Sequence, residues 1–148
     1  MVWPQSRSSI LAPVEAATCN ALLVDEVLIR AFAPVLRDLE GAGVAAPGFR
    51  DNEWSADPEW LAVSLIDLRG GDQPVRVERS LPEPLLVAEL ADAVQEWAIT
   101  ELWPNVATNW PVCPHHPATH PLQASTVELV AVWMCPTYGS PIVPVGSL

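Results

Sequence analysis

The segment that most limits how this chain can fold is residues 110–121, which hold four of its sixteen prolines. Each proline fixes the backbone angle φ and lacks the N–H group that helices and strands use for hydrogen bonding. The segment is therefore predicted to be an irregular loop. It also carries Cys113 and all three histidines of the chain, His115, His116 and His120, so side chains that bind metals gather in one place.

The spacing of these residues suits a metal site. The intervals are Cys113-x2-His116, His116-x3-His120 and His120-x14-Cys135. Structural zinc ions take four Cys or His ligands in a tetrahedral arrangement, and two close ligands on a tight turn meet that need. A hairpin after the loop would bring Cys135 back beside it. We therefore predict a metal site, with zinc as the expected ion, formed by Cys113, His116, His120 and Cys135, with His115 as an alternate donor.

Residues 110–139 resemble a zinc-ribbon or zinc-knuckle module, in which two Cys-Pro turns face each other across a metal ion. The two turns here are residues 113–116 (Cys-Pro-His-His) and 135–139 (Cys-Pro-Thr-Tyr-Gly). The resemblance implies a structural metal site in a degenerate form, because Tyr138 stands where the last ligand of a ribbon is expected. The fourth ligand would then have to come from His120.

The chain as a whole also resembles a family of short, uncharacterised actinobacterial proteins. The shared series is Trp-Pro-x-Cys-Pro, His-Pro, His-Pro-Leu and Trp-x-Cys-Pro, which runs from Trp110 to Pro136 in this sequence. This resemblance implies no activity, substrate or partner.

Two stretches are predicted to form amphipathic helices. Residues 15–40 place apolar side chains at helical spacing, while charged residues, Asp38 among them, fall outside the apolar stripe. Pro34 is expected to kink or break this helix, and the glycines that follow are expected to end it. Residues 82–103 show the same periodicity, and the two prolines at their start suit a first helical turn, where a missing N–H group costs nothing.

Strands are predicted where apolar residues alternate or run continuously between turn residues. Residues 69–72 (Arg-Gly-Gly-Asp) are predicted to be a hairpin turn, and residues 42–58 a loop. In the C-terminal part, residues 136–139 are predicted to turn the chain between two further strands. The predicted strands are residues 60–68, 75–79, 126–134 and 140–145.

These elements define an α+β fold class, with two amphipathic helices packed on a small antiparallel sheet and a C-terminal Cys/His loop followed by a β-hairpin. A chain of 148 residues is the size of one domain. We expect residues 1–14 to form a flexible N-terminal arm and residues 15–109 a helix–hairpin–helix core. Residues 110–148 are expected to form a module packed on that core.

The composition restricts the partners. Eighteen acidic and seven basic residues give a net charge of −11, which disfavours binding to nucleic acids and to anionic membranes. No apolar run approaches the roughly 20 residues that a membrane-spanning helix needs. An odd number of cysteines does not fit a fully paired secreted framework, and no apolar signal region follows Arg7. We therefore expect a cytoplasmic protein that binds neither nucleic acid nor membrane.

Three classes of function fit the sequence. The first is a small accessory or binding protein with a structural zinc site and no catalysis, whose tryptophans at 3, 54, 103 and 110 include anchors for a protein partner. The second is a metal-dependent hydrolase that uses Cys113, His116, His120 and Cys135, with one coordination position open. The third is a thiol or redox protein that uses Cys113 and Cys135. If no metal is bound, the histidines are expected to bond to backbone carbonyls and Cys135 to be buried. No catalytic motif of another kind is present.

Overall fold

The computed structural model describes residues 24–102 and 109–148, which form two helices and two three-stranded antiparallel sheets. The predicted α+β fold class is therefore confirmed. The predicted N-terminal arm, Trp3, Cys19 and Trp103 lie outside the described residues. The division into a core and a C-terminal module stays a prediction. Within the described ranges, no helix is long and apolar enough to cross a bilayer.

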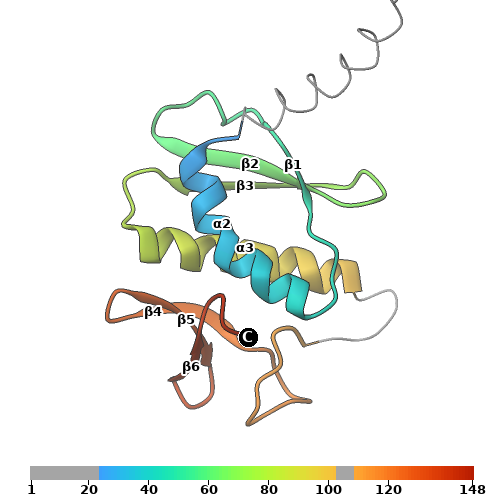
Figure 1. Ribbon diagram of the computed structural model, residues 1–148, viewed down its shortest axis with the longest axis vertical. Helices are drawn as coiled ribbons and strands as arrows, with labels where there is room; N and C mark the ends of the chain where they lie inside the picture. The colour runs from blue at the N-terminus through green and yellow to red at the C-terminus, as the bar shows by residue number, and fades with distance from the viewer. Residues whose placement is uncertain (1–23, 103–108) are drawn as a thin grey trace, which may run out of the picture.

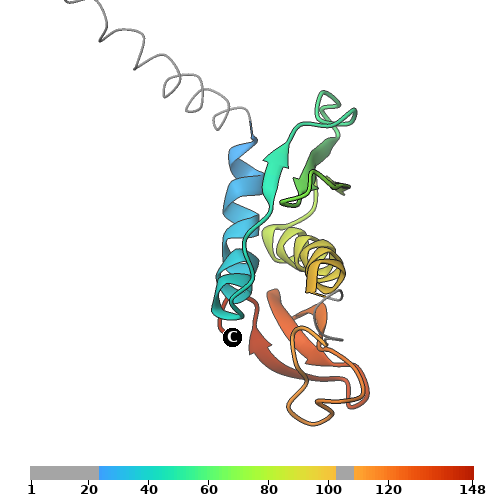
Figure 2. The same cartoon turned by 90° about the vertical axis from the view of Figure 1, so that its right-hand side faces the viewer.

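Helix α3 (Glu83–Leu102) lies between the two sheets, and α2 (Glu26–Gly41) runs along one side of the first sheet and of α3 (Figures 1 and 2). Helix α3 packs against β3 (Asp72–Glu78) of the first sheet and against β4 (Gln123–Val127) and β5 (Val130–Cys135) of the second. Helix α2 packs on α3. One apolar cluster joins these layers, and its largest fully buried side chains include Phe32, Leu90 and Trp133. The strands that carry the candidate site thus share their core with the rest of the protein.

Helix α2 begins after Asp25, whose carboxylate accepts a 2.8 Å hydrogen bond from the backbone N–H of Val27. This is the side-chain capping that satisfies a free donor at a helix start. The helix continues through Pro34, so the break that this proline suggested does not occur. The buried residues Phe32 and Val35 on either side hold the segment against the core, and this packing offsets the lost backbone hydrogen bond.

Glycine ends α2 as predicted. Gly43 has a φ of +75°, and the N–H groups of Gly43 and Val44 bond to the carbonyls of Glu40 and Leu39. This pair of bonds is the Schellman arrangement, which needs a left-handed residue just past the helix.

The helical pattern was wrong about the environment of Asp38. Its side chain is only 2% exposed and accepts hydrogen bonds from the indole N–H of Trp133 at 2.8 Å and the backbone N–H groups of Gly146 at 2.6 Å and Leu148 at 2.9 Å. Three donors compensate a buried carboxylate for the water it has lost. Asp38 therefore fastens the C-terminal end of the chain and strand β5 to α2.

The first sheet contains the predicted hairpin, formed by β2 (Trp60–Ile66) and β3. The side chains of Leu61, Val63 and Leu65 are at most 1% exposed and belong to the shared core. The predicted loop 42–58 contains a strand that sequence patterns did not indicate, β1 (Gly48–Arg50), which pairs with β2. Three residues are too few to show a periodicity of two, so only the pairing reveals this strand.

The second sheet has strand order β4-β5-β6, with β6 (Ser140–Pro144) pairing with β5 as predicted. The single strand predicted for residues 126–134 is instead two strands, because Glu128 and Leu129 form a two-residue turn with φ values of 48° and 64°. Left-handed backbone at both turn positions normally selects Gly or Asn. Glu and Leu give no such signal, so the alternating pattern concealed the turn.

Candidate metal centre

The loop of residues 111–122, which leads into β4, is closed at its two ends by backbone pairing. The N–H group of Leu122 bonds to the carbonyl of Pro111 at 2.8 Å, and Val112 pairs with Pro121 as an isolated antiparallel bridge. The segment entering the loop and the segment leaving it therefore lie side by side. This places Cys113, just after the first segment, near His120, just before the second.

Inside the loop, residues 113–116 form the predicted turn. The backbone N–H of His116 bonds to the carbonyl of Cys113 at 3.2 Å. This bond curls the chain so that His116 Nδ1 lies 3.7 Å from Cys113 Sγ. Two donors are therefore brought together by local backbone geometry alone.

Cys135 comes from the other side, at the end of β5. The turn to β6 is closed by the N–H of Gly139, which bonds to the Cys135 carbonyl at 2.8 Å, and Gly139 adopts a φ of +65°. The Cys135 sulfur lies 3.5 Å from His116 Nδ1. One imidazole nitrogen thus faces both sulfurs.

The environment of the Cys135 sulfur favours its thiolate form. Burial raises the pKa of the Cys135 thiol, but hydrogen bonds from the backbone N–H of Tyr138, the thiol of Cys113 and the backbone N–H of Thr137 lower it by more, so its pKa lies below the ordinary value. Hydrogen bonds to the charged form are a recognised cause of such a shift. The thiolate is also the form of cysteine that binds metals.

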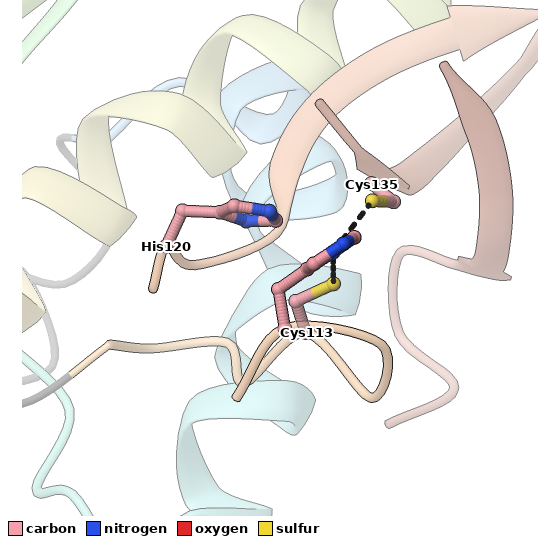
Figure 3. A group of neighbouring side chains, drawn as sticks. Cys113, His120 and Cys135 are labelled. Atoms are coloured by element: carbon pink, nitrogen blue, oxygen red, sulfur yellow. Dashed lines mark hydrogen bonds between the residues drawn. The ribbon is translucent and has the colours of Figure 1, made fainter. Parts of the chain in front are cut away.

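The four predicted ligand residues converge. One donor atom from each of Cys113, His116, His120 and Cys135 can be chosen so that all four lie within 4.8 Å of one another. Figure 3 shows Cys113, His120 and Cys135 directed toward one region from separate backbone segments. A tetrahedral zinc ion, with Zn–S of about 2.3 Å and Zn–N of about 2.0 Å, separates sulfur from nitrogen by about 3.5 Å. The two sulfur–nitrogen distances at His116, 3.5 and 3.7 Å, match that edge.

The two hydrogen bonds of His120 define which of its nitrogens can bind a metal. Nδ1 lies 3.0 Å from the carbonyl oxygen of Pro121, and Nε2 lies 3.0 Å from Thr137 Oγ1. A carbonyl oxygen can only accept, so Nδ1 carries the proton and Nε2 accepts from the Thr137 hydroxyl. A metal ion would take the Nε2 lone pair in place of this hydroxyl donor. Carbonyls that orient histidine in this way are the usual outer partners of metal ligands. Thr137 was not predicted from sequence, because its contact with His120 depends on the β5–β6 turn.

The alternate donor His115 lies outside the group of four. Its side chain is exposed, and its ring centroid lies 5.2 Å from that of Tyr138. The Tyr138 ring, which is 63% exposed, also lies 4.8 Å from the ring of His116. Tyr138 therefore covers His116 on the solvent side.

Gln95 holds both ends of the loop against α3. This buried side chain donates from Nε2 to the carbonyl of Trp110 at 3.1 Å and to the carbonyl of Leu122 at 2.5 Å. Trp110 is itself buried and packs edge-on against Trp133, with ring centroids 5.7 Å apart. Trp110 is thus a core residue, and the interpretation of this tryptophan as an anchor for a partner is not supported.

Replacing Gln95 with alanine is expected to destabilise the protein by about 2 kcal/mol, because two buried carbonyls lose their donor. Zinc affinity should fall as well, since the loop would no longer be held in its binding geometry. Urea unfolding of the metal-free protein and a competition titration with a zinc indicator measure the two effects. Gln123→Ala, at an exposed position of β4, is the matched control. Equal stability and zinc affinity in the two variants would show that Gln95 does not hold the loop.

Comparison with known protein families, with curated proteins and with solved structures finds no match to this chain. The description of the site therefore rests on the residues of this chain alone. The site brings together two cysteines and two histidines, a set that can hold a metal ion.

Proposed function

We propose that this chain is a small accessory or binding protein without catalytic activity, in which a structural zinc ion joins the loop after α3 to the turn between β5 and β6. The observation that carries the proposal is the convergence of four donors from two distant segments, Cys113, His116 and His120 on one side and Cys135 on the other. The bound ion would contribute folding free energy by linking these segments.

The donor set supports zinc as the ion. Two sulfurs and two imidazole nitrogens form the Cys₂His₂ set of many structural zinc sites. Thiolate ligands select against magnesium and calcium, which bind oxygen. The hydrogen bonds that favour the Cys135 thiolate and those that orient His120 prepare two of the four ligands before any metal arrives.

The same geometry favours a structural role over hydrolysis. A catalytic zinc keeps one position open for water, whereas four protein ligands fill a tetrahedral shell. Among the described residues, the group of four includes no carboxylate that would serve as a general base. The hydrolase interpretation required both features.

A catalytic thiol function finds less support. Such a protein needs two neighbouring sulfurs, one of which must be accessible to its substrate. Cys113 and Cys135 are neighbours, but both side chains are 0% exposed.

The surroundings of the site support a protein partner. From Pro111 onward, Glu128 is the only charged side chain in a chain of net charge −11. Near the ligands, Val112 is 56% exposed and Tyr138 is 63% exposed. Uncharged surface with apolar and aromatic side chains suits protein contacts better than contacts with phosphate groups. Trp54 is half-buried, and Arg76 lies over its ring at 4.9 Å, so it contributes less free surface than its position in the sequence indicated.

Elemental analysis of protein purified without a histidine tag tests the metal. We expect close to one equivalent of zinc, because a closed Cys₂His₂ shell binds it tightly enough to survive purification. A variant with serine at both Cys113 and Cys135 controls for metal bound elsewhere. Less than about a tenth of an equivalent in the unmodified protein would contradict a structural zinc site.

A further inference from the structure

The two cysteines of the site are close enough to react with each other. The sulfurs of Cys113 and Cys135 lie within 4.8 Å of each other, and both are unpaired thiols. A zinc ion between them would separate the sulfurs by about 3.8 Å, whereas a disulfide requires about 2.05 Å. The same two sulfurs can therefore hold a metal or bond to each other, but they cannot do both.

We propose that hydrogen peroxide oxidises Cys113 and Cys135 to a disulfide and thereby expels the metal, which makes the site a peroxide-sensitive point of zinc release. This inference rests on the proposed zinc site. It concerns the regulation of that site and requires no catalytic turnover by the protein.

The reaction balances with peroxide as the oxidant. One thiolate attacks a peroxide oxygen, the O–O bond breaks, and the departing hydroxide takes a proton to form water, leaving a sulfenic acid. The second thiolate attacks that sulfur and forms the S–S bond, and the displaced hydroxide takes a second proton. The sulfurs lose two electrons, and peroxide gains them to yield two waters. Zinc leaves as Zn²⁺ because it has no redox chemistry of its own.

The loop side of the site is the part that can move. Cys135 is fixed at the end of β5, where it pairs with Ser140 of β6. Cys113 instead begins a turn whose bonds, from His116 N–H to the Cys113 carbonyl and from Thr119 N–H to the His116 carbonyl, are local to the loop. The turn that Cys113 begins can therefore shift, while Gln95 holds the ends of the loop, by the roughly 2 Å that separates the metal-bound and disulfide geometries.

Burial of both sulfurs selects a small oxidant. Cys113 and Cys135 are 0% exposed, so a protein disulfide or a bulky aromatic disulfide cannot reach them without local opening. Three residues that follow these cysteines in the loop and in the β5–β6 turn, Pro114, His115 and Tyr138, are exposed. A molecule little larger than water can pass between such residues more readily than a large reagent. Hydrogen peroxide fits this restriction.

The decisive experiment adds hydrogen peroxide to zinc-loaded protein in which Cys19 is replaced by serine, so that the other two cysteines are the only thiols. A zinc indicator follows release of the metal, and peptide mapping without reductant follows the disulfide. We expect one Cys113–Cys135 disulfide for each zinc released, and recovery of zinc binding after reduction. A bulky aromatic disulfide reagent should act far more slowly than peroxide.

A variant that holds zinc but cannot form the disulfide is the matched control. Cys113→His keeps four ligands of zinc-binding type, and we expect it to retain its metal at peroxide concentrations that empty the Cys19→Ser protein. Zinc release without a disulfide, or equal release from both proteins, would overturn the inference. Zinc content before peroxide is added tests the proposed zinc site itself, so a failure of that proposal is seen separately.

Discussion

Alanine at His116 is expected to abolish stoichiometric zinc binding, whereas alanine at the neighbouring His115 should leave it intact. His116 Nδ1 is the atom that faces both sulfurs, at 3.7 Å from Cys113 and 3.5 Å from Cys135. Loss of this ligand should lower zinc affinity by more than about a hundredfold, because even outer partners of metal ligands are worth 10- to 100-fold. Competition against an indicator of known affinity measures the change.

The free energy of unfolding should show the same difference between the His115→Ala and His116→Ala proteins. A ligand present at a thousand times its dissociation constant stabilises the folded state by about 4 kcal/mol. We therefore expect zinc to raise the free energy of unfolding of the unmodified protein and of His115→Ala by about that amount, and to leave His116→Ala unchanged. Urea unfolding with excess zinc, and again with a chelator, measures the effect in each protein.

Because His115 and His116 are adjacent in the chain, His115→Ala is a closely matched control for His116→Ala. Both belong to the same loop and both pack against Tyr138, with ring centroids 5.2 Å away for His115 and 4.8 Å away for His116. A general disturbance of the loop would affect both variants alike. If His115→Ala lost zinc and His116→Ala kept it, the ligand assignment would be wrong. If both bound zinc as the unmodified protein does, the proposed site would be excluded.

The candidate site was predictable because its main determinants are local. The prolines at 111, 114, 117 and 121 exclude helix and strand, and the turn at residues 113–116 follows from the Cys-Pro-His-His sequence. Cys135 is returned to the loop by the β4–β5 hairpin, whose turn at Glu128 and Leu129 the alternating pattern concealed. The sequence therefore indicated that a hairpin follows the loop, but not where it turns. Sequence patterns could therefore select the four residues that the structure brings together.

The residues that position the site were not predictable, since their roles come from contacts distant in sequence. Gln95 bonds to carbonyls 15 and 27 residues away, and Thr137 meets His120 across 17 residues. Nothing in the local pattern distinguishes Gln95 from the other polar residues of α3. The same limit explains why β1 was missed and why Asp38 was not expected in the core. Periodicity reports the face on which a residue lies, but not which donors a distant segment brings to it.

Asp38→Ala is expected to destabilise the protein by about 3 kcal/mol, the largest effect we expect away from the metal ligands. Hydrogen bonds to charged groups are worth about 1.5–3 kcal/mol, and a buried donor left without a partner adds a further cost. The donor most affected is Trp133 Nε1, because the Trp133 side chain is 0% exposed. Gly146 and Leu148 are less buried, so their N–H groups can bond to water after the substitution.

A double-mutant cycle with Trp133→Phe separates the contribution of the Trp133–Asp38 hydrogen bond from the other effects of the Asp38→Ala substitution. Phenylalanine removes the indole donor, so Asp38→Ala should cost less in the Trp133→Phe protein than in the unmodified one. Urea unfolding with saturating zinc keeps the metal contribution constant across the cycle. Asp92→Ala, an exposed position on α3, should change stability by less than about 0.5 kcal/mol. If Asp38→Ala cost no more than Asp92→Ala, or if the cycle showed no coupling, the buried carboxylate would not be what holds β5 to α2. Attachment of β5 to α2 would then rest on apolar packing.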